Sequence, residues 1–427
     1  MRARSIRASA ISAGGIFAQR GLSLVSNLVM TRLLVPEAFG LMAMVVLVHI
    51  LVEMMSDIGI SQSIIRSEQG DRPDYLRAAW SVQIVRSSVI ALCVVLAGIG
   101  VFFLGPRLAA PNSVYADANL PWLIMVSAIA VLMRGFESTG MALAQRQLKL
   151  GKVVQIEIGN QIVVIILMIL LAQWKATVWV LLAGMILGSV QRMIWTHLAF
   201  RGVPMRWSWN RDIAADMWTY GRWLILSSLA GFVVNQGDRL FLGAMLDKTT
   251  FGIYVIATLW MDVGQQLISK VAGQVAMSGF AETLRERRER FPIVFRKVQN
   301  AYNALAGATF VGAFFLGPVL IGLMYSADYQ DAGWMLPLLA FRYLVRRQAP
   351  FGAFLLADGN SRAMSMSVVT TAILMCTLLP LFYWTFGLPA TLVFVGLAPM
   401  AGLPVLYVAA RRRMAALPFW SEILTDL

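Results

Sequence analysis

Long apolar blocks with almost no charge most strongly constrain how this chain can fold. Examples are VIALCVVLAGIGVFFLG (89–105), VVIILMILLA (163–172) and AILMCTLLPLFYWTFGL (372–388). A helix of about 20 apolar residues spans a bilayer, whereas a membrane barrel would show alternating strands of about ten residues. Hydrophobic residues make up 59% of the 427 residues and charged residues only 14%. The sequence therefore predicts an all-α polytopic membrane protein.

The apolar blocks predict about twelve transmembrane helices. Their expected bounds are 10–34, 38–62, 78–104, 119–142, 153–172, 176–199, 219–243, 250–277, 298–323, 333–356, 363–386 and 389–410. The first apolar run is too long for the core of a signal peptide and is followed by no cleavage site, so we expect it to be a retained span.

Basic residues in the expected loops indicate how the helices are oriented. If the N-terminus is cytoplasmic, 22 Lys and Arg residues fall on cytoplasmic segments and five on the opposite side. Cytoplasmic loops of membrane proteins carry such an excess. We therefore expect both termini to be cytoplasmic. The same excess explains the net charge of +14, so we expect no nucleic-acid partner.

The stretch FFLGPRL (102–108) returns 212 positions later as FFLGPVL (314–320). The same shift pairs Phe39 with Phe251, Gly40 with Gly252, Trp122 with Trp334, Arg134 with Arg346, Gly140 with Gly352 and Gly184 with Gly396. This register predicts an internal duplication into two six-helix bundles. Because each copy holds an even number of helices, the repeat is parallel, about an axis along the membrane normal.

The duplication divides the chain into three parts. We expect an N-terminal six-helix bundle over 1–200, a cytoplasmic or interfacial linker over 201–218, and a C-terminal six-helix bundle with a short cytoplasmic tail over 219–427. Two such bundles enclose a central cavity, and their rocking gives alternating access. The alternative is a duplicated scaffold that transports nothing.

Several arginines are predicted to lie deep inside spans, where ionisable residues are costly and usually face a polar interior. These are Arg20, Arg134, Arg342 and Arg346, and the register places Arg134 opposite Arg346. Guanidinium groups bind phosphate oxygens bidentately, so cations around a cavity suit an anionic guest such as a diphosphate. The alternative is internal pairing, of Arg134 with Glu137 or of Arg20 with acids of the second helix.

Other charges inside the spans have different interpretations. Glu53 and Asp57 share one helix face, and two nearby carboxylates can share a proton or a cation. This pair is a candidate for ion coupling, with pairing to Arg20 as the alternative. Five residues near predicted helix ends are expected to reach toward the headgroups: Arg192, Asp238, Arg239, Lys270 and Arg347.

The sequence carries no pattern typical of an enzyme. Cys93 and Cys376 lie in apolar runs, and His49 and His197 are isolated, so we expect neither a disulfide nor a metal site. The phosphate-binding pattern GxxxxGK[ST] is absent from the sequence. We therefore expect no catalytic residues and no cofactor.

Five stretches carry a resemblance to a known family: LLVPEAFG (33–40), DIGISQSIIR (57–66), ALAQRQLKLGKVVQIE (142–157), GDRLFLGAMLDKTTFGIY (237–254) and FLLADGNSR (354–362). In order and spacing they resemble the polysaccharide repeat-unit flippases, which carry lipid-linked oligosaccharides. These belong to the polysaccharide transport family of the multidrug/oligosaccharidyl-lipid/polysaccharide transporter superfamily.

The resemblance implies translocation of undecaprenyl-diphosphate-linked oligosaccharides across the bacterial cytoplasmic (inner) membrane, for exopolysaccharide or O-antigen synthesis. By resemblance, a basic cavity receives the diphosphate-sugar head, and Arg20, Arg134, Arg342 and Arg346 are the positions that would serve. The implied partners are the lipid-linked oligosaccharide, the bilayer, and polysaccharide polymerase or assembly proteins. The alternatives are a multidrug-type exporter, a lipid II flippase of the same superfamily, or a non-transporting scaffold of polysaccharide assembly.

Overall fold

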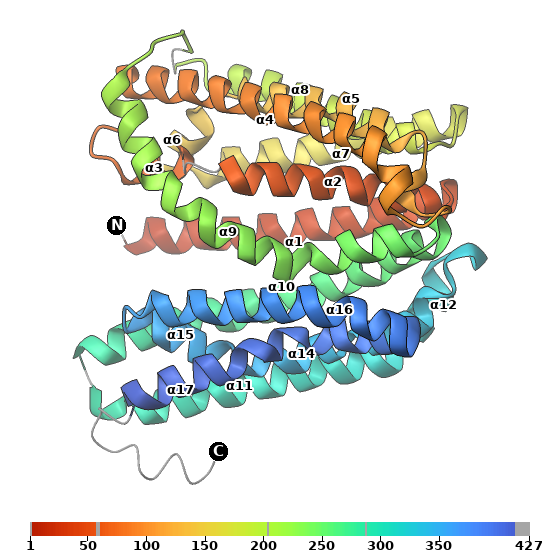
Figure 1. Ribbon diagram of the computed structural model, residues 1–427. Helices are drawn as coiled ribbons and strands as arrows, with labels where there is room; N and C mark the ends of the chain where they lie inside the picture. The colour runs from red at the N-terminus through yellow and green to blue at the C-terminus, as the bar shows by residue number, and fades with distance from the viewer. Residues whose placement is uncertain (1, 57–59, 203–204, 287, 415–427) are drawn as a thin grey trace. The chain divides into compact units, whose positions relative to one another are not determined.

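The computed structural model describes residues 2–56, 60–202, 205–286 and 288–414 (Figure 1). All regular elements in these ranges are helices. The chain divides into two compact units: unit 1 comprises Met1–Leu229 and Leu242–Gly252, and unit 2 comprises Ala230–Phe241 and Ile253–Leu427.

Unit 1 contains eight complete helices. They are α1 (Arg2–Leu33), α2 (Pro36–Ser56), α3 (Ile60–Arg66), α4 (Pro73–Leu108), α5 (Leu120–Gly135), α6 (Gly140–Arg146), α7 (Leu150–Trp174) and α8 (Val178–Ala199), with a 3₁₀ turn η1 (Val114–Ala116). Within this unit α4 and α8 pack along α5, and α1 and α8 pack along α7 (Figure 1). Two long helices, α9 (Arg211–Met245) and α10 (Lys248–Glu286), pass from one unit into the other.

The remaining elements of unit 2 follow along the chain. They are η2 (Arg288–Arg290), α11 (Phe291–Val311), η3 (Gly312–Leu316), α12 (Gly317–Met324), η4 (Ala327–Tyr329), α13 (Ala332–Leu339), α14 (Phe341–Val345), η5 (Arg346–Gln348), α15 (Ala349–Ala357), α16 (Ser361–Leu397), η6 (Ala398–Gly402) and α17 (Leu403–Met414). The second copy of the repeated motif, 314–320, begins in η3, a π-helical turn that joins α11 to α12, and continues into α12.

The helices confirm the predicted fold class. Among the described residues, six stretches are long and apolar enough to cross a membrane, or seven if the bent pair α5–α6 counts as one span. One of them, Ser361–Arg413, has 53 residues, and it is broken at Gly387, where φ is 76° and ψ is −173°. The predicted spans 363–386 and 389–410 flank this break. The chain is thus an all-α polytopic membrane protein, consistent with twelve spans in two bundles.

Two predicted spans are interrupted rather than continuous. The span expected over 119–142 is divided between α5 and α6, which are bent by 55°. The span expected over 333–356 is divided into α13, α14, η5 and α15. The two breaks are related by the repeat, because α5 ends one residue after Arg134 and η5 begins at Arg346. The span expected over 38–62 includes α2, α3 and residues 57–59, which lie outside the described residues.

The first turns of α2 and α10 pack closely inside unit 1. A Cβ atom on Gly252 would collide with the carbonyl oxygen of Pro36, and one on Gly40 would lie 3.3 Å from the Gly252 nitrogen. Nearby, Lys248 Nζ forms an ion pair with Asp117 Oδ2 at 2.7 Å. The glycines of the repeated Phe-Gly dipeptides therefore meet where a side chain would not fit.

Candidate functional site

A cavity of about 450 Å³ lies in unit 1 between α2, α3, α4 and α5. Four of its lining residues are charged: Glu53, Arg86, Arg134 and Glu137. Glutamines and serines line much of the remainder. Charged side chains in membrane proteins usually face such interior cavities, and the volume falls in the range of small-molecule sites. We call this cavity the polar cavity.

Arg134 forms an ion pair inside the polar cavity with Glu53 of α2. Its Nη1 lies 3.1 Å from Glu53 Oε1, and the side chains are 52% and 38% exposed. Arg86 of α4 donates a hydrogen bond of 3.5 Å to the Glu53 carbonyl oxygen. Because exposed ion pairs contribute little to stability, a competing anion can displace Glu53 from Arg134 at modest cost.

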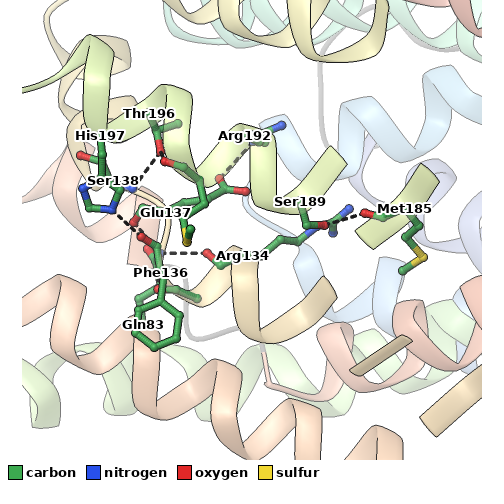
Figure 2. Close-up of polar contacts among 12 residues, drawn as sticks. Gln83, Arg134, Phe136, Glu137, Ser138, Met185, Ser189, Arg192, Thr196 and His197 are labelled. Atoms are coloured by element: carbon green, nitrogen blue, oxygen red, sulfur yellow. Dashed lines mark hydrogen bonds and ion pairs between the residues drawn. The ribbon is translucent and has the colours of Figure 1, made fainter. Parts of the chain in front are cut away.

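The alternative pairing of Arg134 with Glu137 does not form. Glu137 Oε2 instead accepts a hydrogen bond of 3.0 Å from Arg192 Nε of α8 (Figure 2). An i,i+3 contact needs a continuous helix, and α5 ends at Gly135, before Glu137. Arg192 therefore compensates a carboxylate inside unit 1. The alternative pairing of Arg20 with acids of the second helix stays a prediction, because Asp57 lies outside the described residues.

Three more of the residues expected to reach the headgroups have partners within unit 2, and their position relative to the headgroups stays a prediction. Arg239 Nη2 lies 2.9 Å from Asp262 Oδ2, Asp238 accepts a hydrogen bond from the Tyr254 hydroxyl, and Arg347 Nε donates to Asn303 Oδ1 at 2.9 Å. The side chain of Lys270 lies outside the described residues.

Side chains from two other helices satisfy the backbone at the break between α5 and α6 (Figure 2). Gln83 Nε2 of α4 donates to the carbonyl oxygens of Arg134, Gly135 and Glu137 at 3.2, 3.0 and 3.1 Å. His197 Nε2 of α8 lies 2.8 Å from the Phe136 carbonyl oxygen. The last carbonyls of a helix have no partner within it, and membranes require such groups to be satisfied internally. These contacts hold Arg134 at the end of α5.

The repeat-related break in unit 2 has a similar cap. Gln299 Nε2 of α11 donates to the Arg347 carbonyl oxygen at 2.8 Å, and Arg347 is the repeat partner of Gly135. Gln299 itself is the partner of Ser87, one helical turn beyond the partner of Gln83. Neither cap was predicted from the sequence, although Gln83 and Gln299 each lie inside a predicted apolar span.

The structure distributes the other predicted site residues over both units. Arg20 lies exposed on α1 in unit 1, and Arg342 of α14 lines a second cavity, in unit 2. Arg346 begins η5, but its side chain lies outside the described residues, as does the whole of Asp57. The substrate role of the arginines, the coupling role of Glu53 and Asp57, and the position of Arg134 opposite Arg346 stay predictions.

The polar cavity offers guanidinium and amide donors, which suit phosphate and hydroxyl oxygens. In the part of the chain that the structure describes, no three His, Cys, Asp or Glu side chains gather so that they could hold a metal ion. The chemistry that this arrangement supports is therefore noncovalent binding of a polar, anionic group.

Comparison of the sequence with known proteins gives a family and several relatives. Residues 29–333 match the family described as "Polysaccharide biosynthesis protein". The succinoglycan biosynthesis transport protein ExoT of Rhizobium meliloti (strain 1021) is 22% identical over 340 residues, which cover 79% of this chain and 65% of that protein. The lipopolysaccharide biosynthesis protein WzxC of Escherichia coli (strain K12) is 20% identical over 342 residues, covering 80% and 67%. The chain thus spans about two thirds of the length of these relatives.

Two solved structures share the fold. The lipid II flippase MurJ, in an inward closed conformation, matches with a TM-score of 0.72 and 13% identity, covering 93% of this chain and 87% of that one. A multidrug resistance MATE family transporter of the MOP superfamily, inward-facing, matches with a TM-score of 0.70 and 14% identity, covering 94% and 96%. The fold is therefore that of MOP superfamily transporters.

Proposed function

We propose that this chain, which belongs to the polysaccharide biosynthesis protein family, translocates lipid-linked oligosaccharide repeat units across the bacterial cytoplasmic membrane. Its relatives include a succinoglycan biosynthesis transport protein and a lipopolysaccharide biosynthesis protein. Its fold is shared with a lipid II flippase. No covalent step is needed, because the cargo changes sides without changing chemically.

The cargo that fits best is an undecaprenyl-diphosphate-linked oligosaccharide, and the polar cavity is the observation that carries this proposal. A diphosphate that leaves water needs cations and hydrogen-bond donors around it. Arg134 and Arg86 supply the cations, while Gln62 supplies an amide that can bind hydroxyl groups. In this proposal Arg20, Arg342 and Arg346 complete a basic route through two rocking bundles, and most of the lipid chain stays in the bilayer.

Glu53 has a defined part in this scheme. With no cargo bound it neutralises Arg134, so the cation is not left alone at bilayer depth. An arriving phosphate takes the place of Glu53 at the guanidinium group. Glu53, with Asp57, would then be available to bind a coupling ion.

Deletion of the gene tests the function. We expect surface polysaccharide to be lost and lipid-linked precursors to accumulate, with recovery when the wild-type gene is restored. The proposal fails if, in a strain without another flippase, the polymer stays normal and no precursor accumulates. The double variant Arg134→Ala/Arg346→Ala then tests the basic route, with protein levels measured in parallel. Full complementation by that variant would favour a non-transporting scaffold.

The fold shared with a multidrug resistance transporter makes drug export the second candidate. The relatives named for polysaccharide biosynthesis favour oligosaccharide transport over drug export. Efflux of a cationic dye by cells that overproduce the protein would support it, and we expect none.

A further inference from the structure

Among the described residues, the charged side chains that line the polar cavity are two acids and two arginines. Glu53 and Glu137 are the acids, and Arg86 and Arg134 are the arginines. Because these formal charges cancel, the lining does not favour an anion by its net charge. The affinity of the cavity for an anion therefore depends on which carboxylates already engage the arginines.

Glu137 is a second carboxylate that could engage Arg134, in addition to Glu53. Arg134 lies close enough to attract Glu137, and Glu157 of α7 lies close enough to repel it. The side chain of Glu137 is only 15% exposed, and an attraction shielded from water is stronger than an exposed one. Without a partner of its own, Glu137 would therefore compete with an arriving anion for Arg134.

Arg192 of α8 is the partner that Glu137 has instead. Its Nε lies 3.0 Å from Glu137 Oε2 (Figure 2), and Arg192 is not among the residues that line the polar cavity. One helical turn further along α8, Thr196 Oγ1 accepts a hydrogen bond of 3.2 Å from the Ser138 N–H. Helix α8 thus holds Glu137 from behind the cavity, both at its carboxylate and at the adjoining backbone.

The second copy of the repeat lacks both charges of this ion pair. The shift of 212 residues pairs Glu137 with Ala349 and Arg192 with Pro404, whereas Arg134 is paired with another arginine, at position 346. The acid and its cation are therefore present together in one copy and absent together in the other. This pattern is expected if Arg192 serves to neutralise Glu137 and does not itself bind an anion.

We infer that Arg192 is a positioning residue, which sets the anion affinity of the polar cavity by holding Glu137 away from Arg134. Of the described carboxylates, Glu53 alone then has to leave Arg134 when an anion arrives. That exposed pair contributes little, whereas a second, less exposed carboxylate would be harder to displace. The importance of Arg192 for cargo rests on the proposed function, but its effect on anion affinity rests on the geometry of the cavity alone.

Inorganic diphosphate is a suitable probe, because it carries the anionic group without lipid or sugar. Its binding to the purified full-length protein can be measured by isothermal titration calorimetry, and weaker binding by Arg134→Ala would locate it at the polar cavity. We expect Arg192→Gln to weaken binding about tenfold, because Glu137 then engages Arg134. Arg192→Lys keeps the positive charge and should retain most of the affinity.

Removal of the acid should undo the effect of removing the arginine. We expect the double variant Glu137→Gln/Arg192→Gln to bind diphosphate within about threefold of wild type, because the competing charge is gone. An ion pair that served only stability would instead lower the thermal midpoint of Arg192→Gln without changing the affinity of the folded protein.

Lys248→Gln is the matched control for Arg192→Gln. It breaks another ion pair of unit 1, with Asp117, in which the side chains are 37% and 11% exposed, compared with 34% and 15% for Arg192 and Glu137. Neither Lys248 nor Asp117 lines the polar cavity. We expect the affinity of Lys248→Gln for diphosphate to equal that of wild type.

Four results would overturn the inference: no binding of diphosphate to wild type, wild-type affinity in a folded Arg192→Gln, no recovery in the double variant, or equal weakening by Lys248→Gln. If Arg192→Gln does not fold, Glu137→Gln decides. That variant removes the acid and keeps Arg192, so its affinity for diphosphate should rise about threefold. An unchanged or lower affinity would show that the charge of Glu137 does not act on the bound anion.

Failure of the proposed function looks different from failure of this inference. In the first case gene deletion leaves the polymer intact, while the diphosphate affinity of the purified protein still depends on Arg192. In the second case gene deletion removes the polymer, while a folded Arg192→Gln binds diphosphate as wild type does.

Discussion

Glu37 and Thr249 occupy the same position in the two copies of the 212-residue repeat, and the Thr249 hydroxyl donates a hydrogen bond to the Glu37 carboxylate. Beside them the repeat partners Gly40 and Gly252 approach closely. Contact through equivalent residues is what a local twofold axis produces. The first turns of α2 and α10 therefore lie against such an axis, which explains why both copies carry glycine there.

Gly252→Ala should destabilise the protein. Alanine normally stabilises a helix by about 1 kcal/mol relative to glycine, but here its methyl group would collide with the Pro36 carbonyl oxygen. Overpacking of this kind costs about 1–3 kcal/mol, so we expect a thermal midpoint lower by several degrees. Gly279→Ala in the same helix, where the nearest atom would be Val294 Cγ1 at 4.0 Å, is the control. Equal midpoints for the two variants would contradict the close approach.

The ion pair between Asp117 and Lys248 should make the stability of the protein depend on pH. Burial alone would raise the pKa of Asp117, but hydrogen bonds from Lys248 and Asn119 hold it below its ordinary 3.8. A lowered folded-state pKa stabilises the fold above the unfolded pKa, and this contribution is lost as the pH falls through the folded pKa. Asp117→Asn should therefore lower the thermal midpoint at pH 7, with a difference from wild type that shrinks below about pH 4.

The matched control for this experiment is Asp74→Asn. Asp74 pairs with Arg77, but its side chain is 90% exposed, and exposed pairs contribute little. We expect its midpoint to follow wild type at every pH. A difference between Asp117→Asn and wild type that stays constant from pH 7 to pH 3 would rule out the assignment.

The lengths of the apolar stretches predicted the bounds of many helices closely. The helices expected over 153–172 and 176–199 are α7 and α8, Leu150–Trp174 and Val178–Ala199. This agreement has a physical cause, because bilayer thickness sets the length of a spanning helix. The break between α5 and α6 was not predicted, although Glu137, Ser138 and Thr139 interrupt the apolar sequence there. Its capping donors, Gln83 and His197, lie 51 and 61 residues away from their acceptors, beyond any local pattern.

Gln83→Leu should loosen the break between α5 and α6. The carbonyl oxygens of Gly135 and Glu137 lose the side-chain donor that Gln83 provides, while that of Arg134 keeps the N–H of Glu137. A buried unsatisfied group costs about 1–3 kcal/mol. We expect a lower thermal midpoint and faster hydrogen exchange in a peptide covering residues 134–140. Ser88→Ala on the same helix is the control, because its exposed hydroxyl bonds only the Ile84 carbonyl oxygen. Unchanged exchange in Gln83→Leu would show that the other donors suffice.

Charge-reversal variants of Glu53 and Arg134 should separate two roles of Arg134, the ion pair with Glu53 and the proposed binding of cargo. Glu53→Arg and Arg134→Glu each place like charges together, so each should reduce surface polysaccharide about tenfold or more. The double variant restores the pair in reverse and leaves the number of arginines in the polar cavity unchanged. We expect it to recover part of the polymer at matched protein levels. A double variant no better than either single one would show that Arg134 is needed at its own position.

Gly387→Ala should disturb the break within α16. The φ of 76° and ψ of −173° at this residue are adopted almost only by glycine. Alanine there should cost about 1–3 kcal/mol, seen as a lower thermal midpoint. Gly307→Ala is the control, because nothing lies within 4 Å of its added Cβ and its backbone is helical. The assignment is wrong if both variants behave like wild type.

Chemistry at the candidate site was harder to predict than its location. Arg134 was expected to line a cavity and lies at the polar cavity, but its carboxylate partner was not predicted, and the alternative partner considered, Glu137, pairs elsewhere. A spacing of three residues favours Glu137 only if the helix continues, and here it ends at Gly135. The partner actually present, Glu53, is 81 residues away, and tertiary packing alone brings it near.

Gln83 and Gln299 supply the same kind of bond from places one helical turn apart. Both copies thus have a side-chain donor at the break, but the two donors are not repeat partners. The repeat partner of Gln83 is Phe295, and that of Gln299 is Ser87. An alignment of the two copies alone would score such a residue as variable. The hydrogen bonds that satisfy the carbonyl oxygens at a helix end are a better guide to the positions where a substitution is harmful.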